Sequence, residues 1–376
     1  MCAGKVCHCV AFIEGNYYVR TNGTVIDAKD PTPYRVIKDQ TTGALLDGVR
    51  ELAEGSDHAC AVRTDNTVWC WARTLDGNQR GQLGNGTLSV ESPRLARQVQ
   101  ITGSTASAPL FLTDVRSLAH NGYGYGSQSA CAVKNDGTVW CWGRNSEGYL
   151  FSSQSQVAPP ETSFPLAVQV WASPNTPLSG VDQMSIGQSQ ACAVRSGALY
   201  CWGRNYNGAL GVGDTTDRVY ATAVTGLPAT VTKVQASLEF TCALAGGQLY
   251  CWGAGLNGQL CDLGSLSTTE AGCSTKCRLA PAPGTFARDG QTGLPINDIK
   301  NFVLGPNFTV VMRSDNSIRF FGIEFPHAPA PTDLMGGADN LWQLTTWGSN
   351  FPQAVRYMTR DAQYFVGPTM RYPVCQ

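Results

Sequence analysis

The segment ACAVRSGALYCWG, residues 191–203, decides the fold because it recurs along the chain. It returns with small changes as HACAVRTDNTVWCW at 58–71, ACAVKNDGTVWCWG at 130–143 and TCALAGGQLYCWG at 241–253. Each copy alternates apolar with other residues, passes through a short polar turn containing Gly or Asn, and alternates again. That pattern is typical of a β-hairpin. Repetition of one hairpin predicts a repeat architecture.

The two cysteines of each copy are spaced so that they face each other across the hairpin. They are ten residues apart in the two copies with room for a three-residue loop and nine apart in the two that suit a two-residue loop. Residues opposite each other at a non-hydrogen-bonded position have Cα atoms about 4.5 Å apart, at the short end of the disulfide range. The predicted bridges are Cys60–Cys70, Cys131–Cys141, Cys192–Cys201 and Cys242–Cys251.

Three further segments keep the hairpin pattern and lack both cysteines. At the two positions they carry Tyr17 and Asp27, Val310 and Phe320, and Gln353 and Phe365. Joint loss is expected of a bonded pair. The alternatives fit less well: buried unbonded thiols would be lost independently, and zinc favours close Cys-x2-Cys pairs. We therefore interpret the cysteines as stabilising, by about 2–3 kcal/mol for each bridge in the chain-entropy model.

Seven hairpins of this kind are distributed over the whole chain. They start near residues 17, 60, 131, 192, 242, 310 and 353. The closest starts are 43 residues apart. A repeat of about that length, with room for four strands, is typical of a propeller blade. We predict one all-β domain over 1–376, a seven-bladed β-propeller of four-stranded antiparallel blades with loop insertions and intra-blade disulfides. Ring closure is assigned to the N-terminal segment, and the approximate repeats are 1–50, 51–115, 116–180, 181–232, 233–300, 301–343 and 344–376.

A second signature follows the hairpin as WGRNYNGALG at 202–211, with relatives at 142–150 and 252–260 and a looser one over 71–84. These residues resemble the repeat of the regulator of chromosome condensation family, strongly in the four cysteine-bearing repeats and weakly in the first, sixth and seventh. The resemblance implies a seven-bladed β-propeller. We interpret the tryptophans as core between blades rather than as ligand platforms.

The resemblance also bears on function. The founding activity of the family, nuclear nucleotide exchange, needs a reducing compartment and contact with chromatin, which disulfides and the lack of a basic face oppose. Secreted bacterial relatives of the fold act as binding proteins, and one inhibits β-lactamases. That analogy rests on the fold alone.

Composition limits the function classes. Charged residues make up 15% of the chain and the formal net charge is −1, which argues against nucleic acid as a partner and against a polybasic membrane anchor. No apolar run approaches the roughly 20 residues of a transmembrane helix. Fifteen cysteines favour an oxidising compartment, so we expect a secreted, cell-surface or periplasmic protein. No signal peptide is visible, and we expect that it has been removed or that the chain is part of a longer polypeptide.

Seven cysteines lie outside the repeated hairpins: Cys2, Cys7, Cys9, Cys261, Cys273, Cys277 and Cys375. Ring closure would favour a bridge from Cys375 to Cys7 or Cys9, and the insertion with Cys261, Cys273 and Cys277 is expected to hold a bridge of its own. An odd number leaves at least one thiol free or bonded to another chain. Cys2, Cys7 and His8 form only a loose variant of a haem-attachment motif, so no cofactor is expected.

A short loop precedes the first strand of each hairpin, which we expect to be the inner strand of its blade. By repetition these loops should surround one mouth of the central channel. Polar and aromatic residues there would suit a peptide, a sugar or a partner's loop; alternatively, the phenylalanines pack between blades. The predicted binding ring is Asp57, His58, Gln128, Ser129, Ser189, Gln190, Glu239, Phe240, Asn307, Phe308, Asn350 and Phe351. Insertions near 73–80, 85–115, 149–180 and 261–297 are further candidates, since long loops are commonly functional or disordered.

No catalytic constellation is recognisable. The chain lacks a Gly-x-Ser-x-Gly elbow, a His-Glu-x-x-His motif and a P-loop, and its four histidines are scattered. We expect neither an enzyme nor a metal site. The leading hypothesis is an extracellular module that binds a protein or glycan through one loop-bearing face. The alternatives are a self-assembling structural subunit or decoration of a cell-surface filament, and a secreted propeller that acts as an enzyme inhibitor.

Overall fold

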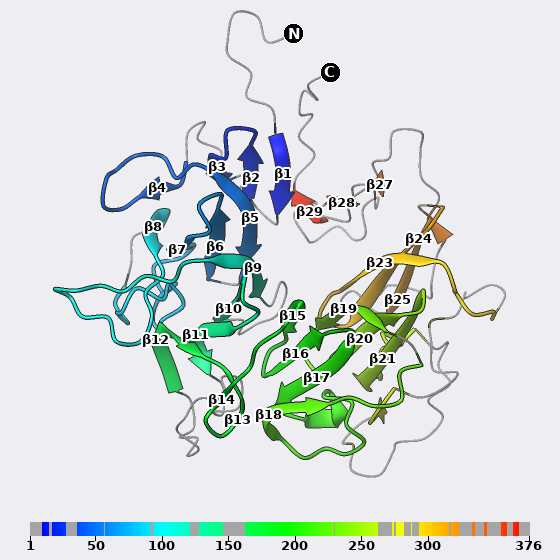
Figure 1. Ribbon diagram of the computed structural model, residues 1–376. Helices are drawn as coiled ribbons and strands as arrows, with labels where there is room; N and C mark the ends of the chain where they lie inside the picture. Colours follow the sequence, from blue (N-terminus) through cyan, green and yellow to red (C-terminus); the bar gives the residue numbers. More distant parts are fainter. Residues whose placement is uncertain are drawn as a thin grey trace, which may run out of the picture.

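The computed structural model places the strands of the chain in a ring of antiparallel sheets (Figure 1). The residues it describes are 10–14, 17–27, 36–55, 57–90, 93–120, 128–145, 162–228, 230–261, 273, 276–281, 287, 293–315, 317–322, 333–334, 342–343, 355–358 and 364–367.

Seven sheets, here called blades 1 to 7, follow one another around the ring in chain order (Figure 1). Blade 1 is β1 (Val10–Glu14), β2 (Tyr17–Arg20) and β3 (Val25–Asp27). Blade 2 is β5 (Val49–Glu54), β6 (His58–Arg63), β7 (Val68–Ala72) and β8 (Leu95–Gln98), with β4 (Lys38–Asp39) parallel to β8. Blade 3 is β9 (Val115–His120), β10 (Ser129–Lys134), β11 (Val139–Asn145) and β12 (Thr162–Gln169).

Blades 4 to 7 repeat the arrangement. Blade 4 is β15 (Gln183–Ile186), β16 (Gln190–Arg195), β17 (Ala198–Gly203) and β18 (Arg218–Ala223). Blade 5 is β19 (Val231–Ala236), β20 (Phe240–Ala245), β21 (Gln248–Ala254) and β22 (Cys277–Arg278). Blade 6 is β23 (Ile299–Leu304), β24 (Phe308–Arg313), β25 (Ile318–Gly322) and β26 (Asp333–Leu334). Blade 7 is β27 (Trp342–Gln343), β28 (Val355–Met358) and β29 (Tyr364–Gly367).

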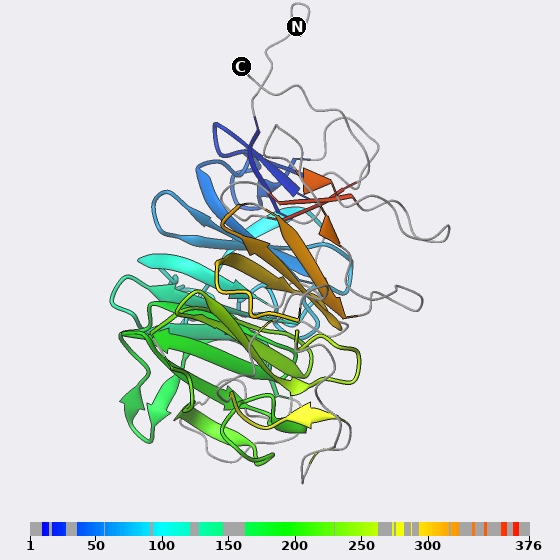
Figure 2. The same ribbon diagram turned by 90° about the vertical axis from the view of Figure 1, so that its right-hand side faces the viewer.

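Two small elements lie between these sheets, the hairpin of β13 (Trp171–Ser173) and β14 (Thr176–Pro177) and a 3₁₀ turn over Tyr206–Gly208. Seen from the side, consecutive sheets pack face to face (Figure 2). The predicted all-β, seven-bladed propeller with four-stranded blades is confirmed. In the described residues blades 1 and 7 have three strands each, and β1 lies against β29 (Figure 1). Ring closure by the N-terminal segment and the exact repeat boundaries stay predictions.

The repeated hairpin supplies the second and third strands of each blade, which corrects one expectation. The strand that begins at His58 was expected to be innermost, but β5 precedes it in the sheet order β5-β6-β7-β8. The first strands of neighbouring blades contact each other from β1 through β5, β9, β15 and β19 to β23. These first strands therefore form the inner ring.

The hairpin register follows the cysteine spacing. In each of the four cysteine-bearing hairpins the two cysteines are opposite each other and bonded, with Cα atoms 4.0 to 4.1 Å apart. The same register places Tyr17 opposite Asp27 and Val310 opposite Phe320 in the copies without cysteines. Intra-blade disulfides are thus part of the observed fold.

The hairpin turns use the residues that their lengths require. Asn66 and Gly137 end the three-residue loops with φ of 62° and 76°, and Ser196 and Gly197 form a two-residue loop with φ of 49° and 77°. Positive φ at both positions is the signature of a type I′ turn, whose twist matches the strands. A feature not anticipated from the sequence is the aspartate of the longer loops: Asp136 accepts a hydrogen bond from the backbone N–H of the residue two positions on, at 2.8 Å.

The fourth strand interrupts two of the expected insertions in the described residues. In blade 2, β8 separates 85–90 from 99–114, and in blade 3 the hairpin of β13 and β14 follows β12.

Candidate functional site

Two connections of each of blades 2 to 5 meet at the same end of the blade in the described residues. One joins the first and second strands, and the other leaves the third strand. The backbone N–H of Arg73 donates to the carbonyl of Asp57 at 2.8 Å, and Arg204 donates to Ser189 at the same distance. We call the connections between first and second strands the mouth loops. Their described residues in blades 2 to 6 are 55, 57, 128, 187–189, 237–239 and 305–307.

The predicted binding ring divides into two classes. The second residue of each pair is buried: His58, Ser129, Gln190, Phe240 and Phe308 are at most 7% exposed. The first residue is half-buried at the surface of the loop: Asp57, Gln128, Ser189, Glu239 and Asn307. Asn350 and Phe351 lie outside the described residues. Phe240 and Phe308 are therefore core, as the alternative interpretation held, and only the first class can meet a partner.

Hydrogen bonds join neighbouring mouth loops across blades. The Gln128 side chain donates to Asp57 Oδ2 at 2.9 Å, which links blade 3 to blade 2. Gln190 donates from Nε2 to the carbonyl of Ser237 at 2.9 Å, and the Ser237 hydroxyl donates to Gly305 O at 2.7 Å. Ser237 was not anticipated, because its role appears only when blades 4, 5 and 6 are side by side. These bonds link the mouth loops of blades 2 and 3, and separately those of blades 4, 5 and 6.

Arginines begin the second connection in blades 2 and 4 and lie near the end of the third strand in blade 3. Arg73, Arg144 and Arg204 follow the tryptophan and small residue that end the hairpin, and all three are half-buried. Arg73 pairs with Glu54 at 2.7 Å, and the Arg204 guanidinium lies over the Tyr206 ring, 5.4 Å from its centroid. The repeated Trp-small-Arg signature could have identified this set. In blade 2 it places Arg73 next to the mouth-loop residue Asp57, whose carbonyl accepts from the Arg73 backbone N–H.

The inner strands are linked by side chains that reach from one blade to the backbone of the next. Arg50 donates to Val115 O at 2.8 Å and Arg116 O at 3.0 Å, and Arg116 in turn donates to Val181 O at 2.6 Å. Such links hold the ring together around its axis. They make these arginines structural rather than available to a phosphate or carboxylate ligand.

Two ionisable groups of the inner ring have perturbed pKa values. Burial raises the pKa of Glu51, although its carboxylate accepts a hydrogen bond from the backbone N–H of Leu118 at 2.8 Å. Burial lowers the pKa of Lys233 to about 8, and its ammonium donates to Asn301 Oδ1 and to Phe302 O. Both groups are occupied by the neighbouring blade, so their shifts reflect packing between blades.

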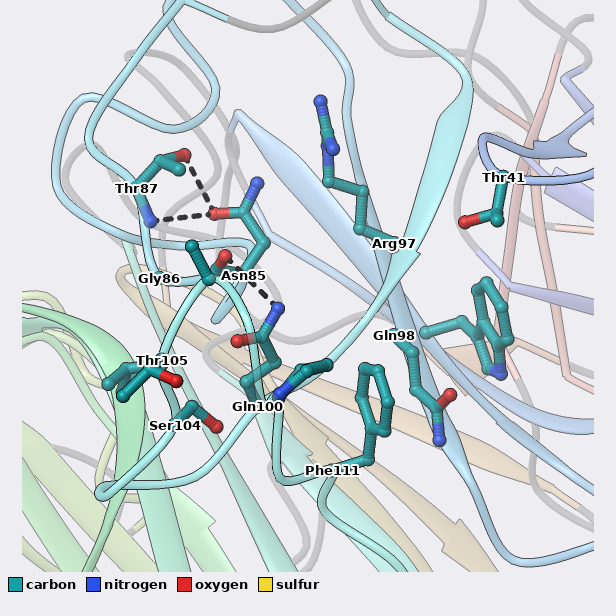
Figure 3. Close-up of a pocket in the computed structure, with 14 residues that line it drawn as sticks. Thr41, Asn85, Gly86, Thr87, Arg97, Gln98, Gln100, Ser104, Thr105 and Phe111 are labelled. Atoms are coloured by element: carbon teal, nitrogen blue, oxygen red, sulfur yellow. Dashed lines mark hydrogen bonds between the residues drawn. The ribbon is translucent and has the colours of Figure 1, made fainter.

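A pocket of about 350 Å³ lies at β8, the edge strand of blade 2 (Figure 3), and its lining includes no described mouth-loop residue. The loop at 85–87, strand β8 and the segment 104–111 form most of its wall, and Leu166 of blade 3 contributes one side. The insertion at 85–115 was a candidate binding segment, but the pocket itself was not predictable from it. Its lining combines amides, hydroxyls and aromatic rings.

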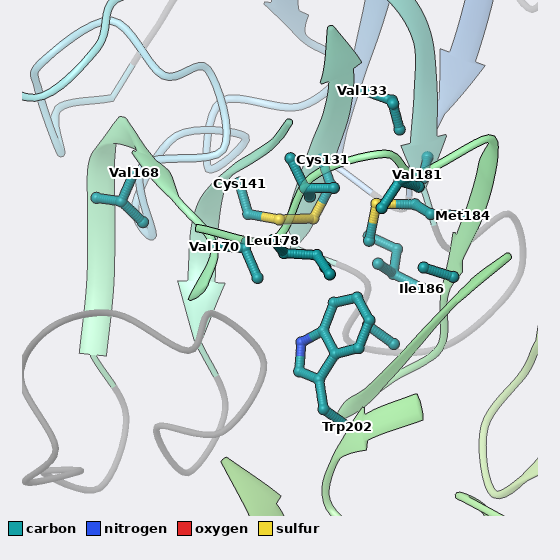
Figure 4. Close-up of a cluster of buried hydrophobic side chains, with 14 residues drawn as sticks. Cys131, Val133, Cys141, Val168, Val170, Leu178, Val181, Met184, Ile186 and Trp202 are labelled. Carbon is teal, nitrogen blue, oxygen red and sulfur yellow. A yellow bond between two sulfur atoms is a disulfide. The ribbon is translucent and has the colours of Figure 1, made fainter. Parts of the chain in front are cut away.

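The repeated tryptophans are core between blades. Trp71, Trp142, Trp202 and Trp252 are fully buried. Trp202 of blade 4 packs beside the Cys131–Cys141 bridge of blade 3, together with Met184 and Ile186 (Figure 4). Trp71, Trp142 and Trp252 likewise pack against buried residues of the blade that precedes their own. They are not ligand platforms.

Of the seven cysteines outside the repeated hairpins, the structure describes Cys261, Cys273 and Cys277. The sulfur atoms of Cys273 and Cys277 lie next to each other, with Cα atoms 6.2 Å apart, and a bridge in this insertion stays a prediction. Cys261 is buried, and its thiol donates to Gln259 O at 3.5 Å. Cys2, Cys7, Cys9 and Cys375 lie outside the described residues, so their pairing stays a prediction.

No group of three or more His, Cys, Asp or Glu side chains in the part of the chain that the structure describes has an arrangement suited to a metal ion. Within the same residues, no helix combines the length and the apolar character that crossing a membrane requires.

Comparison with known proteins identifies the kind of repeat. The model of the regulator of chromosome condensation (RCC1) repeat matches residues 196–244, and a second model of that repeat matches 49–71 and 124–148. A structure of Kap60 bound to yeast RCC1 (Prp20) aligns with a TM-score of 0.57 at 13% identity, covering 88% of this chain and 75% of that chain.

Two further structures agree. Prp20p from Saccharomyces cerevisiae, described with its binding properties to Gsp1p and histones, aligns with a TM-score of 0.55 at 13% identity, over 88% of this chain and 77% of that one. Human WBSCR16 aligns with 0.54 at 14% identity, over 82% and 75%. At such identities the likeness shows the fold alone. The chain is an RCC1-like β-propeller, and propellers of this kind are typically binding or exchange-factor proteins.

Proposed function

We propose that this RCC1-like propeller is an extracellular binding module that recognises a protein or glycan through its mouth loops, and that it acts by binding rather than by catalysis. One observation carries the proposal: each described mouth loop buries its second ring residue and leaves its first at the surface. Asp57, Glu239 and Asn307 are thereby presented on one rim by three different blades. Polar groups spaced around a rim suit an extended partner that contacts several blades.

The rim is held in place before any partner arrives. Hydrogen bonds such as Gln128 to Asp57 join the loops, and the buried residues behind them anchor each loop in its blade. A preorganised surface loses less conformational entropy when it binds. The rigid rim therefore supports specific recognition rather than loose adhesion.

The proposed location outside the reducing cytosol rests on the disulfides. Four bridges occur at one register in blades 2 to 5, and all eight cysteines are buried. Structural disulfides persist in secreted, cell-surface or periplasmic proteins and are rare in the cytosol. We expect native material to contain these bridges intact.

The test compares two triple variants of the full chain. The mouth variant carries Asp57→Ala, Glu239→Ala and Asn307→Ala. The matched control carries three exposed substitutions at the opposite end of the blades, Thr64→Ala, Thr113→Ala and Arg195→Ala. Both are measured against an immobilised panel of glycans and secreted proteins by biolayer interferometry.

A partner found with the unmodified chain should bind the mouth variant at least tenfold more weakly and the control within twofold. Equal binding by the mouth variant would assign recognition to another surface. Failure of the unmodified chain to bind any member of the panel saturably would contradict the binding-module proposal itself.

A further inference from the structure

An exposed apolar side chain recurs at one position of the second connection, the loop that leaves the third strand of a blade. It is the fourth residue after the buried tryptophan: Leu75 in blade 2, Tyr206 in blade 4 and Leu256 in blade 5. Their exposed fractions are 63%, 43% and 63%. A single exposed leucine needs no explanation, but recurrence at the same end of three blades indicates a surface that meets another molecule.

Each of the two leucines follows a residue that is bonded to an acidic mouth loop. The backbone N–H of Arg73 donates to the carbonyl of Asp57 at 2.8 Å, and Leu75 is two residues further along the chain. In blade 5 the residue two positions before Leu256 donates in the same way to the carbonyl of Glu239, at 2.9 Å. The repeat therefore places one acidic and one apolar residue on adjoining loops in blade 2, and again in blade 5.

Neither carboxylate is neutralised within the described part of the chain. Asp57 Oδ2 accepts a hydrogen bond from the side-chain amide of Gln128 at 2.9 Å, and Glu239 Oε2 accepts one from that of Asn207 at 3.1 Å. These amides are uncharged, and no Lys, Arg or His side chain among the described residues pairs with either acid. Since a carboxylate has about four acceptor positions on its two oxygens, each acid retains capacity for a cationic donor.

Blade 4 shows what the repeated apolar position can hold. There the guanidinium of Arg204 lies over the ring of Tyr206, 5.4 Å from its centroid. In blade 2 the corresponding arginine, Arg73, pairs with Glu54 at 2.7 Å, and blade 5 has alanine at that position. The chain therefore covers the tyrosine with a cation of its own, whereas at the two leucines a partner can supply one.

Lysine and arginine side chains match both halves of such a site. Their methylene stems lie along apolar surface while the charged group reaches an acid. A glycan of neutral or acidic sugars brings no positive charge to either carboxylate, and an acidic surface would be repelled. The combination of an unneutralised acid with an exposed leucine therefore favours a protein partner over a glycan.

We infer that the mouth binds a protein whose contact surface carries lysine or arginine beside apolar residues, with one cation at Asp57 and Leu75 and another at Glu239 and Leu256. The inference deepens the proposed function and rests on the mouth loops being the binding surface. Blades 3 and 4 separate the two sites around the ring (Figure 1), so the partner contacts the mouth at two places.

The test measures binding of the full chain to a fluorescein-labelled peptide of repeated Gly-Leu-Lys units by fluorescence anisotropy. Two comparison peptides carry glutamate in place of lysine and alanine in place of leucine. The lysine peptide should bind saturably and at least tenfold more tightly than either comparison peptide. Its affinity should fall with added salt, because the contacts are ionic.

Two double variants separate the charge from the apolar contact. Asp57→Asn with Glu239→Gln removes both charges and leaves oxygens that can still accept the amide hydrogen bonds. It should weaken binding of the lysine peptide at least tenfold and remove the salt dependence. Leu75→Ala with Leu256→Ala should weaken binding at least fivefold and leave the salt dependence unchanged.

Each double variant has a matched control among residues that precede the first strands, at the end of the blades away from the mouth loops. Asp114→Asn with Asp182→Asn removes the same charge from two exposed aspartates. Leu45→Ala with Leu294→Ala removes two exposed leucines. Both controls should bind the lysine peptide within twofold of the unmodified chain.

Lack of binding by the lysine peptide, equal binding of the glutamate peptide, or equal losses in a mouth variant and its control would overturn the inference. The inference and the proposed function fail in distinguishable ways. If a glycan or protein of the panel depends on the mouth variant's residues while the lysine peptide does not bind, the proposed function stands and the inference falls. If neither the panel nor the peptide binds, both fall.

Discussion

Trp252 of blade 5 donates its indole N–H to the carbonyl of Ala209 in blade 4 at 3.1 Å. Trp142 of blade 3 does the same to Gln82 of blade 2 at 3.0 Å. In both blades the acceptor lies two residues before a glycine of positive φ, Gly211 or Gly84. The Gly-x-Leu-Gly signature is therefore a socket for the tryptophan of the following blade.

Gly211→Ala should destabilise the propeller by about 2–3 kcal/mol, because an added Cβ would clash with the buried Trp252 indole and φ is +71°. Gly213→Ala is the control, since its φ is +92° and nothing lies within 4 Å of an added Cβ. It should cost about 1 kcal/mol, the strain of the left-handed backbone alone. Urea unfolding of both variants measures the difference, and equal losses would refute the socket.

Cys261 and Phe321 depart from the repeat together. Cys261 occupies the socket position of Gly211 with φ of 64°, and blade 6 presents Phe321 where the other blades present tryptophan. The two lie in one buried cluster. The smaller phenylalanine leaves room for the thiol.

The pair is tested by a double-mutant cycle. Phe321→Trp alone should destabilise the protein by about 2 kcal/mol through overpacking, and Cys261→Gly should recover at least 1 kcal/mol of that loss in the double variant. Chemical denaturation of the four proteins gives the coupling free energy. Additive effects within the error of the measurement would show that the two departures are unrelated.

Removing one bridge should lower stability without abolishing the fold. Cys192→Ala with Cys201→Ala should reduce the free energy of unfolding by about 2–3 kcal/mol, since the bridge closes a short loop. Non-reducing peptide mapping of the unmodified protein should recover the four intra-hairpin pairs. Free thiols at Cys192 and Cys201 in folded native material would contradict the bonded hairpin.

Stability should rise with pH through the titration of Lys233. Burial lowers its pKa from 10.5 to about 8, so the unfolded chain binds the proton more tightly than the folded one. The buried ammonium therefore lowers the free energy of unfolding. This loss is complete below pH 8 and disappears as pH rises through 10.5. Between pH 7 and 9.5 we expect the unmodified protein to gain about 1–2 kcal/mol relative to Lys233→Met, measured by urea unfolding at each pH. A pH-independent difference would show that the ammonium is well solvated.

The sequence by itself determined the hairpins and their bridges. The Cys192–Cys201 pair could be predicted because the register of a hairpin depends on the length of its turn and on the residues that turn allows, which are all local. The same counting predicted the facing of Val310 and Phe320. The number of copies then gave the number of blades.

Only the tertiary structure decided what lies between blades. The strand that precedes each hairpin became the inner strand, because it contacts its counterparts in the neighbouring sheets. Ser237 joins blades 4 and 6, and the blade 2 pocket combines β8 with Leu166 of blade 3. These contacts connect residues tens of positions apart, and their geometry depends on how the sheets pack around the ring rather than on any local pattern.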